Sequence, residues 1–287
     1  MSLPLPPLKE QRKIAAVFSA LDDKIETNRK TRTTLEKMMQ TLYRSWFVDF
    51  HPVAAKSEGR KPAFMTDDVA ALFPSELGPD GIPVGWSVGK LIRPDLCSFA
   101  KPLSKVPAQD LYAYLPTANI HHSHISGFEE HTASDLPSRA RMTWKDCRVF
   151  VARMKDSPKH FQTLGAHQAF WNEKLFSTGF VGLDPAPGYG AWLYSYIQSQ
   201  EFEDQKNALV SGAVMQALNN ESIKSIDVVI PPPAVAAAYE DQVKLWRQKA
   251  FDLYLENLTL AELRETLLPK LMSGEIRVGS TETDDQP

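Results

Sequence analysis

The chain has 287 residues, 43% of them hydrophobic and only 14 of them glycine, enough to bury a sizeable core in one domain with an accessory element. No apolar run approaches 18 residues and no basic-then-apolar leader is present, which excludes a membrane span and a secretion signal and predicts a soluble cytoplasmic protein. Two cysteines, Cys97 and Cys147, are too few for a disulfide framework or a zinc site, and the net charge of −3 argues against a protein that coats nucleic acid.

The first element of the chain is repeated near its end. Residues 3–47 (LPLPPLKEQ…TTLEKMMQTLYRSWF) and residues 228–272 (VVIPPPAVA…LTLAELRETLLPKLM) align without a gap, residue 3 matching residue 228. An internal repeat around an unrelated middle indicates one structural unit, used twice, that holds a variable insert.

Both copies carry core-type positions at alternating steps of four and three residues, the heptad period of a coiled coil. The first seam is Ile14, Phe18, Leu21, Ile25, Asn28, Arg32, Leu35, Met39, Leu42 and Trp46. The second is Tyr239, Val243, Trp246, Ala250, Leu253, Asn257, Leu260, Arg264, Leu267 and Leu271. The polar members are typical of positions that fix register or partner at a cost in stability, although they also fit places where helices splay and admit water.

Proline clusters precede both copies, so each helix is expected to begin at Pro7 or Pro233. A helix of about 40 residues is roughly 60 Å long, and two such amphipathic rods bury their seams most simply as an antiparallel pair. Residues 1–61 hold 12 Lys/Arg against 7 Asp/Glu and residues 239–287 hold 6 against 10. The two helices are therefore electrostatically matched, although a solvated surface would look the same.

The predicted organisation is a coiled-coil helix over 1–50, a linker over 51–85, a compact domain over 86–230, a second coiled-coil helix over 231–275 and a disordered tail over 276–287. Within the middle domain, short apolar runs such as DLYAYLP, CRVFVARM, STGFVGLDP and AWLYSYIQS are punctuated by Gly, Pro and Asn. This texture predicts strands with a few short helices. The expected fold class is α+β, with a mixed, mainly antiparallel sheet flanked by two long helices.

The middle domain is close to neutral, but residues 139–160 contain seven Lys/Arg against two Asp, interleaved with apolar residues. A basic face of this kind can contact phosphate and base edges, although a solvated sheet face would have the same composition. The candidate DNA-binding residues are Arg139, Arg141, Lys145, Arg153, Lys155, Lys159 and His160, with Lys101 and Lys105 as lesser candidates.

Motifs for catalysis and metal binding are missing from the sequence. It has no GxxxxGK[ST] phosphate loop, no GxGxxG turn, no GxSxG nucleophile elbow and no HExxH pair. The cluster of His121, His122 and His124 lacks the further ligands of a zinc site and is interpreted as a polar surface cluster. Asp204 with Lys206 is the nearest pattern to a nuclease site, and acids beside lysines are common on helices. We therefore expect neither a catalytic site nor a bound metal.

Several runs together resemble the specificity subunit of type I restriction-modification enzymes. They are the PLPPLKEQ opening of the repeat, LYRSWFVDFHPV from Leu42 to Val53, the linker ALFPSELG…IPVGW, the passage SGAVMQALNNESIKSIDVVIPPP and the closing ETLLPKLMSGEIRV. The resemblance covers both helices, the linker and the end of the middle domain, which corresponds to a target-recognition domain. It implies a non-catalytic subunit of a methyltransferase/endonuclease complex.

The resemblance also implies the partners. The domain is expected to read one half of a bipartite target in double-stranded DNA, and the helices to dock modification (methyltransferase) subunits. S-adenosylmethionine and ATP are expected on those subunits and on the restriction (motor-nuclease) subunit, and no cofactor on this chain. A full family member has two recognition domains, so this chain looks like a half subunit.

A half subunit of this kind is expected to form a homodimer with two-fold symmetry that reads an inverted repeat. Its interface is expected to be near exposed seam residues, among Asn28, Arg32, Leu35, Met39, Leu42, Trp46, Asn257, Leu260, Arg264, Leu267 and Leu271. The alternative is a coiled-coil interaction protein, an orphan half subunit that binds modification subunits without productive DNA recognition.

Overall fold

The computed structural model describes residues 6–121, 123–211 and 217–278. The chain divides into two units, one made of Met1–Met38 with Trp246–Pro287 and the other of Met39–Leu245. The predicted disordered tail lies outside the described residues from position 279 onward. No described helix combines the length and the apolar character needed to cross a lipid bilayer.

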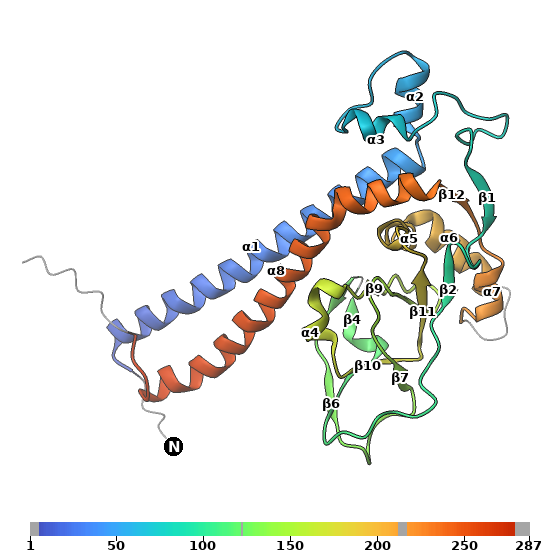
Figure 1. Cartoon of the computed structure of the whole chain (residues 1–287). Coiled ribbons are helices and arrows are strands. Elements are labelled where there is room, and N and C mark those ends of the chain that lie inside the picture. Colours follow the sequence, from blue (N-terminus) through green and yellow to red (C-terminus); the bar gives the residue numbers. More distant parts are fainter. Residues whose placement is uncertain (1–5, 122, 212–216, 279–287) are drawn as a thin grey trace, which may run out of the picture. The chain divides into compact units, whose positions relative to one another are not determined.

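The first unit is built from parts of two long helices, α1 (Leu8–Phe47) and α8 (Pro233–Ser273), which run antiparallel and side by side (Figure 1). Arg264 pairs with Asp22 and Lys24 with Glu256, so contacts late in α8 meet positions early in α1. Every position of the two predicted seams is buried or half-buried. The heptad prediction is therefore confirmed, and α8 continues past Pro269 to Ser273.

The polar seam residues bond to each other within one chain. Asn28 donates from Nδ2 to Oδ1 of Asn257 at 2.9 Å and to Oε2 of Glu256 at 3.0 Å. Asn257 in turn donates to the backbone carbonyl of Ile25 at 3.2 Å. Asn28 is only 2% exposed, so the expectation that it lies on an exposed surface between two chains is wrong. Its amide is satisfied by the other helix of the same chain, which fixes the register of the pair.

Two four-stranded sheets form the second unit. One has the antiparallel order β2-β11-β8-β9, with β2 Cys97–Phe99, β11 Phe180–Pro185, β8 Val149–Ala152 and β9 His160–Gln162. The other has the order β6-β3-β10-β7, with β6 Glu129–His131, β3 Tyr112–Leu115, β10 Lys174–Ser177 and β7 Ala140–Met142. Only β3 and β10 run parallel among the paired strands of the described ranges. The expected mixed, mainly antiparallel sheet structure is confirmed.

Two strand pairs and several short helices complete this unit. The pairs are β1 (Ser87–Lys90) with β12 (Asp227–Ile230), and β4 (Ile120–His121) with β5 (His124–Ile125). The helices are α2 His51–Ser57, α3 Asp67–Ala71, η1 Thr117–Asn119, η2 Gly165–His167, α4 Gln168–Trp171, α5 Gly190–Ile197, α6 Gln200–Ser211 and α7 Asn220–Lys224. The run AWLYSYIQS therefore forms α5 rather than a strand. Seven of its eight helical residues are buried, so its apolar character reflects burial on all sides.

Aromatic side chains hold the two four-stranded sheets in one core. The ring of Phe150 on β8 stacks on that of Phe161 on β9 with centroids 4.6 Å apart, and it also contacts Phe176 on β10 at 4.8 Å. All four residues of β8 are buried, so both faces of this strand are covered. The strands thus form a rigid base for the turns at their ends.

Candidate nucleic-acid interface

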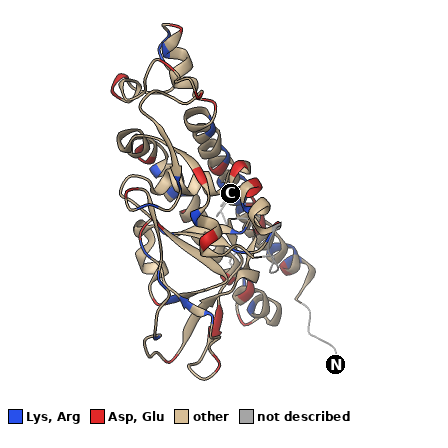
Figure 2. Ribbon diagram, turned by 90° about the vertical axis from the view of Figure 1, so that its right-hand side faces the viewer, with Lys and Arg blue, Asp and Glu red and all other residues tan. Residues whose placement is uncertain are grey.

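The predicted basic stretch is not one strand but three short ones, β7, β8 and β9, joined by turns. Its candidate residues are consequently distributed over three places. In Figure 2, Lys and Arg positions lie among Asp and Glu positions along the ribbon. The position of each residue on the sheets therefore decides which of them can act together.

One end of the sheets brings four of the candidates together. The register pairs Ser177 at the end of β10 with Ala140 at the start of β7, and Phe180 at the start of β11 with Ala152 at the end of β8. β9 begins beside the end of β8. The turn between β10 and β11 is thus bordered by residues from β7, β8 and β9. We call this place the basic edge and define it by Arg139, Arg153, Lys155 and Lys159.

Backbone hydrogen bonds fix the basic edge around the β10–β11 turn. The amide of Thr178 donates to the carbonyl of Arg139 at 2.9 Å, and the amide of Arg153 donates to the carbonyl of Gly179 at 3.3 Å. Nε of Arg153 also donates to the carbonyl of Thr178 at 3.3 Å. Residues far apart in the sequence therefore have fixed relative positions here.

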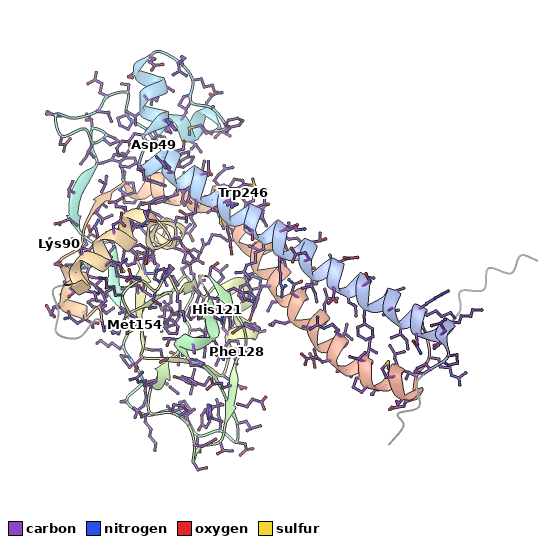
Figure 3. All side chains as sticks on the ribbon, turned by 180° about the vertical axis from the view of Figure 1, so that it is seen from behind. Asp49, Lys90, His121, Phe128, Met154 and Trp246 are labelled. Atoms are coloured by element: carbon purple, nitrogen blue, oxygen red, sulfur yellow. The ribbon has the colours of Figure 1, made fainter. Side chains whose placement is uncertain are left out.

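The 3-10 helix η1 closes the other side of the turn. Nζ of Lys159 donates to the carbonyl of Thr117 at 3.3 Å. A Cβ added at Gly179 would lie 2.9 Å from Cγ2 of Thr117, so the turn and η1 are in close contact. The chain then enters β4, whose exposed His121 is labelled in Figure 3.

Arg153 and Arg139 have different surroundings within the edge. The guanidinium of Arg153 donates to the carbonyl of Leu218 at 2.9 Å and to Oδ1 of Asn220 at 3.1 Å, and its partial burial lowers its pKa. These bonds make Arg153 mainly a positioning group. Arg139 is exposed and Lys155 is half-buried, so their side chains are accessible to a ligand at the surface.

A second group lies along β7. Nη1 of Arg141 donates to the carbonyls of Leu103 and Ser104, at 3.1 and 2.6 Å, and the amide of Leu103 donates to the carbonyl of Arg141 at 2.7 Å. This contact attaches the loop that carries the exposed Lys101 and Lys105 to the edge of the sheet. The two lysines and Arg141 thus form a separate basic patch beside β7.

Lys145 occupies the turn before β8, at the opposite end of that strand from Arg153. Its ammonium lies 3.2 Å from Oδ2 of Asp184, whose Oδ1 accepts a hydrogen bond from Nε of Arg148 at 2.6 Å. Burial alone raises the pKa of Asp184, but the bonds and charges of Arg148 and Lys145 hold that pKa below its ordinary value. Lys145 therefore shares one carboxylate with Arg148 in a structural ion-pair network.

His160 lies inside the unit and not on its surface. It is 1% exposed, and its Nε2 is 2.7 Å from Oε1 of Glu203 on α6. Burial lowers the pKa of its imidazole, and the bond to Glu203 opposes that shift. A buried side chain cannot reach a nucleic acid, so the sequence-based placement of His160 among the contact residues is corrected.

Sequence reasoning did not identify Thr117 and Thr178, which also border the basic edge. It also did not identify the buried Arg148, which lies at the other end of β8. The two threonines belong to segments without basic character, and only strand pairing brings them beside the arginines. His121 and His124 lie in the β4–β5 hairpin. Over the described ranges, no three side chains among His, Cys, Asp and Glu are grouped closely enough to hold a metal ion.

Known proteins are similar to this chain in sequence and in fold. A family model described as the type I restriction modification DNA specificity domain matches residues 1–37. The HindI specificity subunit of Haemophilus influenzae is 24% identical over 96% of this chain and 69% of that protein. The MjaIX specificity subunit of Methanocaldococcus jannaschii is 25% identical over 97% of this chain and 61% of that protein.

A crystal structure of the S subunit of a type I restriction-modification system from M. genitalium shares the fold. It has a TM-score of 0.52 over 93% of this chain and 61% of that one, at 17% sequence identity. In sequence the chain is therefore similar to specificity subunits of type I restriction-modification systems, the family that the sequence analysis found it to resemble. The chain spans about two thirds of the length of these relatives.

Proposed function

We propose that this chain is a sequence-specific DNA-binding subunit whose second unit reads one half-site of double-stranded DNA through the basic edge. The observation that carries the proposal is that Arg139, Arg153 and Lys159, which flank β7, β8 and β9, are hydrogen-bonded to the β10–β11 turn or to η1 beside it. Lys155 lies in the adjacent β8–β9 turn. Arg and Lys at strand ends can contact phosphates, and arginine also reads guanine in the major groove. The patch of Arg141, Lys101 and Lys105 is a second, outer contact in this proposal.

The same proposal gives the helix pair the role of docking modification subunits. The polar seam is satisfied inside the chain, so partners contact outward faces of the helices. The chain itself is non-catalytic in this scheme. S-adenosylmethionine and ATP bind to the modification and restriction subunits that complete the complex.

A homodimer forms part of the proposal because a bipartite target needs two recognition domains. Two copies related by a two-fold axis read an inverted repeat with a fixed spacer. Sedimentation of the chain with its modification subunit tests this directly. A complex that contains two copies of the chain is expected, and a complex with a single copy at micromolar concentration contradicts the homodimer.

Selection from a random duplex library, with the modification subunit present, tests DNA recognition. One short half-site sequence is expected to be enriched. Arg139→Ala and Lys155→Ala each remove one phosphate contact, and the salt dependence of log K against log[salt] is expected to fall by about 0.9 per contact. Lys145→Ala is the matched control, since it removes the same charge at the opposite end of β8.

The result also separates the proposal from the alternative. An orphan subunit that binds modification subunits without DNA recognition enriches no sequence, and its Arg139→Ala and Lys145→Ala variants bind DNA equally. The proposal that the chain recognises a half-site predicts one enriched sequence and a difference in DNA affinity between these two variants.

A further inference from the structure

The turn between β8 and β9 is held from behind by helix α6. Lys206 donates from Nζ to the carbonyl of Ser157 at 3.0 Å, and the amide of Asp156 donates to Oδ1 of Asn207 at 2.9 Å. Glu203 accepts from Lys206 at 2.7 Å and bonds to His160 at the same distance. We call Glu203, Lys206 and Asn207 the α6 clamp. Its three side chains lie within one and a half turns of helix and face the same hairpin.

The clamp holds a backbone conformation that the turn does not favour by itself. Asp156 has a φ of 51°, in the left-handed region that non-glycine residues adopt infrequently. Such a residue persists where surrounding contacts determine its conformation, and the bond from its amide to Asn207 is a contact of this kind.

The charged members of the clamp are tied to structure rather than offered to a ligand. The side chain of Lys206 is 0% exposed and that of Glu203 is 13% exposed. Burial lowers the pKa of Lys206, and its bond and charge interaction with Glu203 oppose the shift. A buried ion pair is stable only while both partners remain, so α6 and the hairpin are fixed to each other.

The turn that the clamp holds carries part of the basic edge. Arg153 and Lys159 flank it and Lys155 lies within it, next to Met154, which is 57% exposed and labelled in Figure 3. Contact residues must be held within about 0.5 Å of their productive positions by the residues behind them. A turn that changes conformation therefore moves these basic groups relative to Arg139.

We propose that the α6 clamp determines sequence specificity without touching DNA, by positioning the β8–β9 turn. This inference rests on the proposed function of the basic edge. Glu203, Lys206 and Asn207 are positioning residues. The nuclease-like pair of Asp204 and Lys206 does not form a site, because Lys206 is buried in the clamp whereas Asp204 is exposed and accepts a bond from Gln200 at 2.8 Å.

Asn207→Ala tests the clamp at a half-buried position, where it removes the acceptor of the Asp156 amide. Amide hydrogen exchange of the full chain without DNA is expected to show a loss of protection at Asp156 of about threefold to tenfold, the effect of one hydrogen bond. The ratio of affinity for the selected duplex to that for random duplex is expected to fall by a similar factor. Asn207→Asp keeps an acceptor oxygen and is expected to restore both quantities.

Asp204→Asn is the control on the same helix, and it should change neither quantity. Lys206→Met is the stronger variant, and its unfolding midpoint is measured beside its affinity ratio. An unchanged affinity ratio in Asn207→Ala with faster exchange at Asp156 overturns the specificity role but leaves the proposed function intact. Unchanged exchange at Asp156 overturns the clamp itself. A wild-type chain without sequence preference overturns the proposed function and this inference together.

Discussion

Replacing Asn28 by alanine should destabilise the helix pair of the first unit by about 2 kcal/mol. The substitution removes two donated hydrogen bonds, to Asn257 at 2.9 Å and to Glu256 at 3.0 Å. Each bond contributes about 0.5–1.5 kcal/mol net, and the value for the bond to Glu256 lies at the low end because that carboxylate is 41% exposed. The acceptor of Asn257 then remains near the seam without this donor, which adds to the loss.

Substitution of both asparagines distinguishes the interaction between Asn28 and Asn257 from their other contacts. Asn28→Leu with Asn257→Leu replaces both amides by apolar groups, so the double variant should be about as stable as the wild type. A double-mutant cycle should then give a coupling of about 1 kcal/mol or more. The same double variant should also lose register specificity, and it should form a mixture of oligomers on sedimentation.

Urea denaturation followed by far-UV circular dichroism measures these free energies, and amide exchange in α1 and α8 locates the effect in the helix pair. Thr33→Ala, at an exposed position of α1, is the control and should change stability by less than about 0.5 kcal/mol. The reasoning is refuted if Asn28→Ala behaves like Thr33→Ala, or if the two asparagine substitutions are additive.

Two further predictions concern the second unit. Burial lowers the pKa of His160 in the folded state, so the unfolded state takes up its proton at a higher pH than the folded state. The free energy of unfolding should therefore decrease as the pH falls below about 6.5, with a slope of up to about 1.4 kcal/mol per pH unit. Glutamine in His160→Gln can still bond to Glu203 but does not titrate, so urea titrations from pH 7 to 5 should show a smaller dependence of unfolding free energy on pH. An unchanged pH dependence contradicts the role given to His160. Gly182→Ala should destabilise the unit by about 1–3 kcal/mol in thermal unfolding, because its Cβ would lie 2.7 Å from Cβ of Ala100 and 2.8 Å from Cε of Met142.

The long helices were predictable because their signal is local and occurs twice. The spacing of seam residues reports the period of a helix directly, and the repeat confirms the same spacing in a second sequence. Which helix each seam packs against was harder to predict from the sequence. Asn28 fits an interface between two chains as well as one within a chain, and only the bond to Asn257 distinguishes them.

The basic edge was only partly predictable, because strand pairing and not sequence distance assembles it. The stretch from Arg139 to His160 suggested one basic face, but it forms three strands joined by two turns. Lys145 and Arg153 therefore lie at opposite ends of β8. His160 has the polar character of a surface residue, and its burial depends on Glu203, which lies 43 positions away. Composition cannot reveal such a partner.

The antiparallel contacts of α1 and α8 have a consequence for the order of folding. Residues of α1 and α8 that meet in the helix pair include Asn28 with Glu256 and Asp22 with Arg264, which are 228 and 242 positions apart. Closing a flexible loop of that length costs chain entropy before any seam contact is gained. Collapse of the intervening strands shortens the loop, so the strand-rich unit should fold first and the helices should pair afterwards. The helix pair therefore forms late, and its formation should depend on prior folding of the segment that connects α1 to α8.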